Sequence, residues 1–222
     1  MKVASTAVGL ASERVRARMV ERVCEQGVRD ARVLGAMERV PRHHFVDAAL
    51  ASRAYEDTAL PIGFGQTISQ PYIVARSAEL ALDGRQDLAP LKILEIGTGC
   101  GYAAAVFAQL VGTVVSIERV RALHELARDR LRPLRIANLR LVFGDGALGL
   151  AAAAPFDAII AAAAGEEVPQ PWIDQLAPQG RIVAPVGANE QHLLVVSRDA
   201  DGKVHRQVHE AVRFVPLRPG TL

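Results

Sequence analysis

The feature that most constrains the fold is a regular alternation of two sequence patterns between residues 71 and 186. Short runs that are nearly continuous in apolar residues, such as "KILEI", "TVVSIE" and "DAIIAA", are separated by segments with helical spacing. Strands that are apolar on both faces are typical of a parallel sheet covered by helices on both sides. The pattern therefore predicts an α/β fold with a doubly wound, mostly parallel sheet.

The elements expected in this region follow one another in a fixed order. Helices are expected at 71–83, 101–111, 120–131 and 170–177, and strands at 91–96, 113–118, 139–143, 156–161 and 181–186. After Gly187, two extended runs flank an Asp-Ala-Asp-Gly turn. This pattern predicts an antiparallel hairpin at the edge of the sheet.

Two helices are expected before the alternating region. Apolar residues recur with helical spacing from 10 to 26, and Gly27 can end that helix with a left-handed cap. The second helix begins at Asp30, a good N-cap, and stops at Pro41. Residues 55–70 hold no sustained period, so we expect an ordered loop there, with turns at Pro61 and at Gly63 to Gly65.

The size of the chain favours a single domain. It has 222 residues, half of them apolar, which is enough for one substantial core. We expect one domain over 1–222, made of N-terminal helices (1–54), a loop and helix start (55–75), a ligand-binding core (91–186) and C-terminal edge strands (187–222).

Charge and cysteine content exclude several classes of function. Lys plus Arg number 26 and Asp plus Glu number 24, so we expect neither nucleic acid nor an anionic membrane as a partner. Cys24 and Cys100 lie far apart without a CxxC spacing, which argues against a disulfide framework and favours the cytoplasm. No signal peptide, membrane helix or exposed apolar stripe is evident, and we expect a monomer.

No metal site is expected. His205 and His209 are four residues apart on a predicted strand, which puts their side chains on one face but ~13 Å from each other. That separation is too long for one metal ion to bind both.

The stretch "KILEIGTGCGYAAAV" predicts a ligand-binding turn. Gly97, Gly99 and Gly101 separate an apolar strand from a helix, and the free N–H groups of a helix start favour a ligand there. The spacing G-x-G-x-G differs from the dinucleotide fingerprint G-x-G-x-x-G, and the acidic Glu95 precedes it. A carboxylate repels a pyrophosphate but tolerates a cation, which favours S-adenosylmethionine with its ammonium and sulfonium groups. The alternative is a tight turn without a ligand.

Two further acids follow neighbouring strands. Glu118 ends the second strand, about 20 residues beyond the glycines, where a carboxylate can accept hydrogen bonds from both ribose hydroxyls. Asp145 lies in "GDG" after the third strand and can meet an adenine edge. Taken singly, Glu118 could be a solvated charge at a strand end and Asp145 a turn former. Together they converge on one crevice, because the carboxyl ends of parallel strands share one edge of the sheet.

The chain resembles the protein-L-isoaspartate (D-aspartate) O-methyltransferases over nearly its whole length from residue 10. The resemblance is carried by "YEDTALPIGFGQTISQPYIVA", "LEIGTGCGY", "GDG", "APFDAII" and "VRFVPL". "GQTISQP" and "VRFVPL" are the segments most distinctive of this family. The resemblance implies a Rossmann-like methyltransferase with an N-terminal helical extension.

The resemblance also implies site residues. Ser69 matches the serine usually regarded as the active-site residue, with Thr67 and Ile68 lining the same pocket. The residues that match cofactor-binding positions of the family are Ile68, Gly97, Thr98, Gly99, Glu118, Asp145 and Gly146. Thr67 and Ser69 are expected to contact the substrate.

Some positions depart from the usual family pattern. Phe64 and Ala103 replace residues that are commonly polar, Ser77 replaces a common methionine, and Glu166 and Glu167 add charges near the expected rim of the site. These departures leave the fine substrate preference open.

The activity implied is methyl transfer from S-adenosylmethionine, leaving S-adenosylhomocysteine, to the free α-carboxylate of L-isoaspartyl and D-aspartyl residues. The ester then closes to a succinimide, which begins the repair of damaged proteins and peptides. Two alternatives stay open: a related carboxylate O-methyltransferase with a different peptide acceptor, and a non-catalytic module that binds S-adenosylmethionine.

Two residues near the site have competing interpretations. Ser69 could cap the helix that starts at Pro71 instead of orienting an acceptor. Cys100 could be a nucleophile at a helix N-terminus, but a small filler of the turn is the favoured interpretation.

Overall fold

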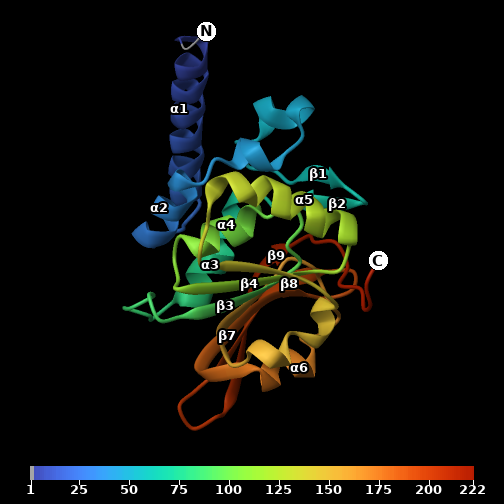
Figure 1. The fold of residues 1–222 in the computed structure, drawn as a ribbon. Coiled ribbons are helices and arrows are strands. Elements are labelled where there is room, and N and C mark those ends of the chain that lie inside the picture. Colours follow the sequence, from blue (N-terminus) through green and yellow to red (C-terminus); the bar gives the residue numbers. More distant parts are fainter. Residues whose placement is uncertain (1–2) are drawn as a thin grey trace.

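The computed structural model describes residues 3–222, with side chains described from Ser12 onward. A seven-stranded sheet lies at the centre, with helices packed on both of its faces (Figure 1). A separate two-stranded sheet, made of β1 and β2, lies above the helices of the upper face in this view. The fold class expected from the sequence is confirmed.

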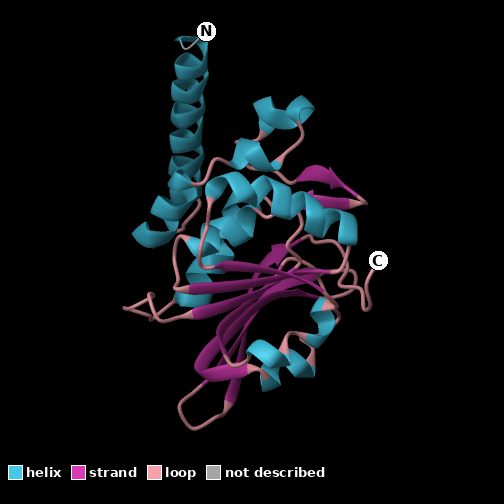
Figure 2. Ribbon diagram, viewed as in Figure 1, coloured by secondary structure: helices cyan, strands magenta, loops and turns pink. Residues whose placement is uncertain are grey.

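The order of the strands creates a crevice at the carboxyl ends of the parallel strands. The strands are β3 (Lys92–Ile96), β4 (Thr113–Glu118), β5 (Leu139–Phe143), β6 (Phe156–Ala161), β7 (Leu176–Val186), β8 (Gln191–Arg198) and β9 (Val204–Val212). They lie in the order β5-β4-β3-β6-β7-β8-β9, parallel from β5 to β7 and antiparallel from β7 to β9 (Figure 2). The chain moves outward from β3 to β5 and then returns to the other side of β3. Such a reversal is where open α/β sheets bind ligands.

Three helices cover one face of the sheet and a short helix covers the other. The helices are α1 (Val3–Glu25), α2 (Ala31–Arg39), α3 (Pro71–Leu82), α4 (Tyr102–Ala108), α5 (Arg121–Leu131) and α6 (Gln170–Asp174). Short 3-10 helices occupy Arg42–Phe45, Ala48–Arg53, Arg132–Leu134, Gly146–Leu148 and Ala151–Ala153.

The helices that cover the sheet can be followed in Figure 1, where α3, α4 and α5 lie above the sheet and α6 below it.

Successive side chains along the strands pack alternately into two hydrophobic cores. In β3, the fully buried Ile93 packs with the core under α3 to α5, and its neighbour Leu94 packs with the core around Trp172 of α6. Successive side chains of a strand point to opposite faces, so a strand buried on both sides needs apolar residues at every position. This requirement explains the nearly continuous apolar runs of the sequence.

Both expected N-terminal helices are present and end as predicted. The N–H groups of Gly27 and Val28 donate to the carbonyls of Cys24 and Val23, and Gly27 has a φ of 114°. This is the left-handed cap that ends α1. The Asp30 side chain accepts the N–H of Arg32 and caps α2.

The region expected to be a loop at 55–70 contains a hairpin. Strands β1 (Leu60–Gly63) and β2 (Gln66–Ile68) pair in antiparallel register, with Leu60 opposite Ile68. The strands are too short to show a period, and the chain reverses at Phe64 and Gly65, both with positive φ. The turn expected at Gly63 to Gly65 is thus confirmed, whereas the turn expected at Pro61 and the loop expected at 60–63 and 66–68 were wrong.

Four element ends differ from the expected ones by three residues or more. Helix α1 begins at Val3 rather than at 10, α4 ends at Ala108 rather than at 111, α6 ends at Asp174 rather than at 177, and β7 begins at Leu176 rather than at 181. The added part of β7 reaches Phe156 of β6 across an irregularity in the register, and Gln179 there takes a φ of 60°. A bulge of this kind lengthens a strand across residues whose composition indicates a turn.

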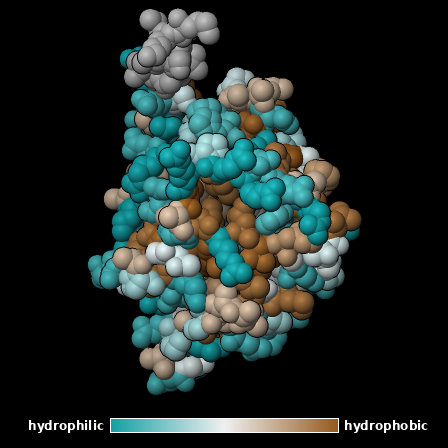
Figure 3. All heavy atoms as spheres, viewed as in Figure 1, coloured by the Kyte–Doolittle hydropathy of each residue, from teal (hydrophilic) through white to brown (hydrophobic). Residues whose placement is uncertain are grey.

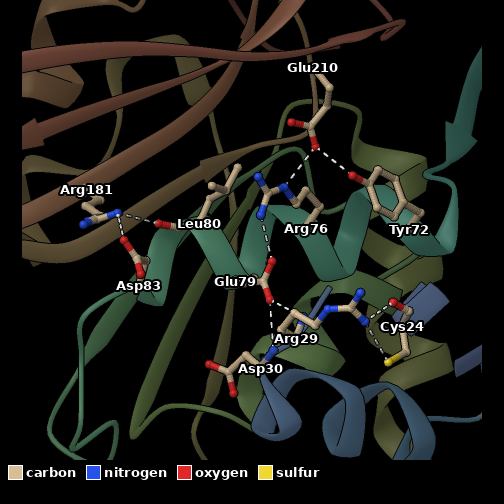
Figure 4. Close-up of polar contacts among 10 residues, drawn as sticks. All are labelled: Cys24, Arg29, Asp30, Tyr72, Arg76, Glu79, Leu80, Asp83, Arg181 and Glu210. Carbon is tan, nitrogen blue, oxygen red and sulfur yellow. Dashed lines mark hydrogen bonds and ion pairs between the residues drawn. The ribbon is translucent and has the colours of Figure 1, made fainter. Parts of the chain in front are cut away.

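Helix α3 links the N-terminal helices to the sheet (Figure 4). The Glu79 carboxylate accepts the backbone N–H groups of Arg29 at 2.5 Å and Asp30 at 2.9 Å, just before α2 begins. One turn further along, at the C-cap of α3, the Arg181 guanidinium of β7 pairs with Asp83 at 3.0 Å. These polar contacts fix α3 between two parts of the chain that are far apart in sequence.

The surface is mixed in character. On the face seen in Figure 3, hydrophilic side chains cover the helices of the upper part, and hydrophobic ones gather in the middle. The large hydrophobic side chains that stay exposed among the described residues lie on separate elements: Val15, Phe64, Leu148, Val208 and Leu222. No helix in residues 3–222 combines the length and the apolar character needed to span a bilayer.

Gly101 gives a test of the turn that starts α4. It has a φ of 91°, and a Cβ built on it would lie 2.8 Å from Leu131 Cδ1 of α5. We expect Gly101→Ala to lower the free energy of unfolding by about 2 to 4 kcal/mol, through the left-handed backbone and the added contact. Urea unfolding measures this loss.

Gly84→Ala is the matched control. Gly84 has a φ of 78°, but a Cβ there meets no atom within 4 Å. Its free energy of unfolding should fall only by the cost of placing alanine in a left-handed backbone conformation, about 1 to 2 kcal/mol. Equal losses in the two variants would contradict the packing of Gly101 against α5.

Candidate active site

The turn after β3 brings bare backbone to the edge of the sheet. Gly97, Gly99 and Gly101 all have positive φ, at 92°, 55° and 91°. The Ile117 carbonyl of β4 accepts the N–H groups of Gly97 at 2.8 Å and Thr98 at 3.1 Å. The turn is therefore fixed to the neighbouring strand, and its glycines leave room for a ligand against the main chain.

Glu118 ends β4 directly beside this turn. Its Oε2 accepts the N–H of Gly99 at 2.8 Å, and its Oε1 accepts the N–H of Val120 at 2.9 Å. The residue is only 5% exposed, yet it lines the crevice at the end of the sheet. A carboxylate held by two N–H groups keeps lone pairs for further donors, as ribose hydroxyls would be.

Glu95 is a fully enclosed acid at the base of the same region. Its Oε2 accepts a hydrogen bond from the Ser116 hydroxyl, which also lies 2.5 Å from the Thr98 hydroxyl. Its Oε1 is buried without a hydrogen-bond partner. Burial raises the pKa of Glu95 to about 8, against the lowering effect of the Ser116 hydrogen bond and with the negative charge of Glu118 adding to the rise.

The crevice gathers residues that follow four parallel strands. Of the expected cofactor residues, Gly97, Gly99, Glu118 and Gly146 line it, and Thr67 of β2 joins them. Thr98 is 4% exposed and directs its hydroxyl to Ser116. Ile68 is also 4% exposed and packs in the larger core. Sequence motifs therefore gather at one site, although not every motif residue faces the crevice.

Asp145 is engaged by the backbone. Its Oδ1 accepts the N–H of Ala147 at 2.9 Å, which caps the short helix Gly146–Leu148. Its Oδ2 accepts the N–H of Gly220 at 2.6 Å. The carboxylate that was expected at an adenine edge thus also holds the C-terminal segment.

The segment after β9 closes one side of the crevice. Val215, Pro216, Leu217 and Arg218 line it. Two backbone hydrogen bonds with Ala164 hold this segment, 2.8 Å from the Ala164 N–H to the Val215 carbonyl and 2.7 Å from the Leu217 N–H to the Ala164 carbonyl. The motif "VRFVPL" was noted in the sequence, but its place in the crevice was not predicted.

A second hollow, the acceptor groove, adjoins the crevice. It has a volume of about 550 Å³ and is lined on one side by residues 57–59, 67, 69, 70 and 73 and on the other by residues 211–215, with Ala162 between them. Thr67, Ala162 and Val215 line both the crevice and the groove. The two hollows therefore meet at these residues.

Ser69 lies where the groove approaches Glu95. It lines the groove and also a small inner cavity that Glu95, Ser77 and Phe107 share. The N-cap residue of α3 is Gln70, not Ser69, and the Gln70 side chain makes no capping hydrogen bond. The interpretation of Ser69 as the cap of α3 is therefore wrong.

Sequence reasoning missed several residues of the groove. Asp57, Arg213 and Phe214 line it, and Arg119 lines the crevice. Arg119 could have been found from its place directly after Glu118. Asp57 and Arg213 lie inside segments that the family resemblance singled out, but the spacing gave no reason to choose them.

The environment of Cys100 differs from that of a nucleophilic cysteine. Cys100 is 2% exposed, and burial raises the pKa of its thiol, which disfavours the thiolate that a nucleophile requires. Within the described part of the chain, no group of three or more His, Cys, Asp or Glu side chains is arranged to hold a metal.

Comparisons with known proteins find relatives that match most of the chain. The model of the family described as "Protein-L-isoaspartate(D-aspartate) O-methyltransferase" matches residues 14–221. The protein-L-isoaspartate O-methyltransferase of Methylibium petroleiphilum is 60% identical over 217 residues, covering 96% of this chain and 81% of its relative.

Two solved structures share the fold. One, titled protein-L-isoaspartate O-methyltransferase, has a TM-score of 0.80 at 29% identity and covers 90% of this chain and 65% of its own. The other, a putative enzyme of that name from Plasmodium falciparum in complex with S-adenosyl-L-homocysteine, has a TM-score of 0.80 at 23% identity, with 91% and 98% covered.

Glu95 gives a pH test of the site. Its pKa is raised from 4.5 to about 8 in the folded chain, so the unfolded chain releases this proton at lower pH. The stability contributed by the protonated acid is complete below pH 4.5 and is lost as the pH rises toward 8. We expect the wild type to lose up to about 1.4 kcal/mol per pH unit relative to Glu95→Gln across this window.

Urea unfolding of the wild type and Glu95→Gln at pH 5.5, 6.5 and 7.5 measures the difference. The amide cannot ionise but keeps an acceptor for Ser116. Parallel stability curves for the two proteins would show that Glu95 keeps an ordinary pKa.

Proposed function

The chain belongs to the protein-L-isoaspartate(D-aspartate) O-methyltransferase family, and from this premise we propose how its own residues carry out the reaction. The substrate is a protein or peptide that contains an L-isoaspartyl or D-aspartyl residue. The free carboxylate of that residue receives a methyl group, and the ester closes to a succinimide that returns part of the damaged sites to normal aspartate.

The crevice fits S-adenosylmethionine. That cofactor supplies an electrophilic methyl group on a sulfonium. Gly97 and Gly99 offer bare backbone, and the Glu118 carboxylate can accept hydrogen bonds from ribose hydroxyls. A carboxylate at this position suits a ligand that carries positive charge and no phosphate. Apolar side chains such as Ile117 and Leu123 suit the adenine ring.

The observation that carries the proposal is the junction of the two hollows. Thr67, Ala162 and Val215 line both, so a methyl donor in the crevice and an acceptor in the groove can meet there. Ser69 lies on the groove side of this junction and can donate its hydroxyl hydrogen to an acceptor carboxylate.

The reaction requires no general base. A carboxylate with an ordinary pKa near 4 is already ionised at neutral pH, so the attacking oxygen carries no proton to remove. The attacking carboxylate and the sulfonium neutralise each other in the transition state, and water that solvates them opposes the reaction. Exclusion of water and alignment of the two groups are therefore the main contributions of the protein. Ile73, Ala162 and Phe214 supply apolar surface for this purpose.

Arg213 supports an anionic acceptor. Its side chain is exposed and lines the acceptor groove, where a guanidinium attracts a carboxylate before the reaction. Because the acceptor loses its charge on methylation, this attraction also favours release of the neutral ester.

The test is methyl transfer from labelled S-adenosylmethionine to matched hexapeptides that contain isoaspartate or aspartate at one position. The proposed function requires transfer to the isoaspartyl peptide and at least tenfold less to the aspartyl one. Equal transfer would indicate a carboxylate methyltransferase with another acceptor. Binding of the cofactor without transfer would indicate a non-catalytic module.

We also propose that the whole chain acts as one monomeric domain in the cytoplasm. The scattered positions of the exposed large hydrophobic side chains support a monomer. Both cysteines are free, which supports a reducing compartment.

Glu118 tests the cofactor site. We expect Glu118→Ala to weaken the binding of S-adenosylhomocysteine at least about tenfold, because hydrogen bonds to a charged acceptor contribute about 1.5 to 3 kcal/mol each. Titration calorimetry measures the affinity, and thermal unfolding checks the fold, since Glu118 also holds the Gly99 and Val120 N–H groups. Glu125→Ala, an exposed acid on α5, is the control. Unchanged affinity in Glu118→Ala would remove this carboxylate from the cofactor site.

Ser69 tests the acceptor site. We expect Ser69→Ala to leave the affinity for S-adenosylhomocysteine within a few-fold and to slow methyl transfer by about ten- to a hundredfold, because misalignment is penalised mainly in the transition state. Single-turnover kinetics on an isoaspartyl peptide measures the rate, with Ser197→Ala of β8 as the control. A variant that loses only cofactor affinity would place Ser69 in the nucleoside pocket instead.

A further inference from the structure

The two walls of the acceptor groove are attached to the same turn of α3. One wall is the segment 57–59, and the other is the segment 211–215, which comprises the last two residues of β9 and the three that follow it. They are far apart in sequence and share no strand pairing. The separation of the two walls therefore depends on side-chain contacts.

The first wall is held through Asp57. Its Oδ1 accepts the N–H of Tyr72 at 3.0 Å, and its Oδ2 accepts the amide groups of Gln70 at 2.8 Å and Gln26 at 2.7 Å. The Tyr72 N–H belongs to the first turn of α3, where backbone donors have no partner inside the helix. Asp57 thus satisfies a helix N-terminus and fixes the wall to it.

The second wall is held through Glu210, which immediately precedes Ala211. Its Oε1 accepts the Tyr72 hydroxyl at 3.1 Å and the Arg76 Nε–H at 3.1 Å (Figure 4). Arg76 in turn donates to Glu79 at 2.8 Å, so this contact is part of the polar network that holds α3 in place. Strand β9 pairs only with β8 in the sheet, so its other side depends on such contacts.

Tyr72 joins the two attachments. Its backbone N–H holds Asp57 and its hydroxyl holds Glu210, so one residue connects both walls. The ring does not line the groove. We propose that Tyr72 is a positioning residue that sets the separation of the two groove walls and thereby the affinity for acceptor peptides. This proposal rests on the proposed function of the groove.

The charges around Tyr72 support its role as a donor. Burial raises the pKa of the Tyr72 hydroxyl, and the neighbouring Glu210 carboxylate raises it further. Burial opposes ionisation of Glu210, but hydrogen bonds from backbone, Tyr72 and Arg76 outweigh it, and the net pKa of Glu210 is lowered. At neutral pH the pair is therefore a phenol that donates to a carboxylate.

The expected effect concerns binding rather than the methyl-transfer step. Tyr72 reaches neither hollow, and the residues at their junction keep their own contacts when its hydroxyl is removed. A wider or looser groove holds the peptide less well both before and during the reaction. Such a uniform loss raises KM and leaves kcat unchanged.

Tyr72→Phe is the test, because it keeps the ring and the N–H to Asp57 and removes only the bond to Glu210. We expect the KM for an isoaspartyl hexapeptide to rise about three- to tenfold, with kcat and the Kd of S-adenosylhomocysteine within twofold of wild type. Tyr102→Phe is the matched control, since the Tyr102 hydroxyl is buried against Met37 and should leave KM unchanged.

Variants of Glu210 test whether the effect passes through this contact. Glu210→Ala should raise KM as much as Tyr72→Phe or more, and adding Tyr72→Phe to it should cause no further rise. Glu210→Gln keeps an acceptor oxygen and should restore most of the affinity. Additive rises in the double variant would show that Tyr72 acts through another partner and would overturn the proposal.

The remaining outcomes separate this proposal from the proposed function. A wild type that prefers the isoaspartyl peptide, together with an unchanged KM in Tyr72→Phe, overturns the positioning role alone. A fall in kcat without a change in KM does the same, because it places Tyr72 in the chemical step. A wild type without preference for isoaspartate overturns the proposed function and with it the acceptor on which this inference rests.

Discussion

The hydrogen bonds that Glu118 accepts from Gly99 and Val120 hold together the surface on which the site depends. One carboxylate joins the turn after β3 to the start of α5. This link spans two adjacent strand ends and holds the turn in which the three glycines take positive φ. The segment 215–218 lines the same crevice from the C-terminal part of the chain.

Two acids a few residues from the same turn have opposite environments. Both oxygens of Glu118 accept backbone N–H groups at the crevice, whereas Glu95 lies among apolar side chains with one oxygen unpartnered. Burying a charge without partners is costly, so Glu95 holds its proton at neutral pH. Environment rather than residue type thus decides which of the two is the anion.

Patterns confined to a few consecutive residues predicted the fold well. The strand expected at 113–118 is β4 to the residue, because its middle positions 114–117 are buried and carry only apolar or small side chains. The hairpin at 60–68 could not be predicted, because strands of four and three residues show no period and Pro61 lies in one of them. Long-range contacts were equally hidden: nothing in "GDG" indicates that Asp145 meets Gly220, 75 positions later.

The residues of the site also differ in how well the sequence predicts them. The glycine turn and Glu118 are visible in the sequence because local geometry requires those residue types. The attachment of Glu210 to Tyr72 spans 138 positions and depends on how the edge strand packs on α3, which only the folded chain reveals.

The late position of the segment 211–218 has a consequence for synthesis of the chain on the ribosome. The four parallel strands whose ends carry the glycine turn and Glu118 are complete once β6 has emerged. A nascent chain that has reached only β8 still lacks one wall of the groove and one side of the crevice. The strand ends around the glycine turn are therefore synthesised well before the residues that follow β9, and an unfinished chain lacks the segment that shelters both hollows from solvent.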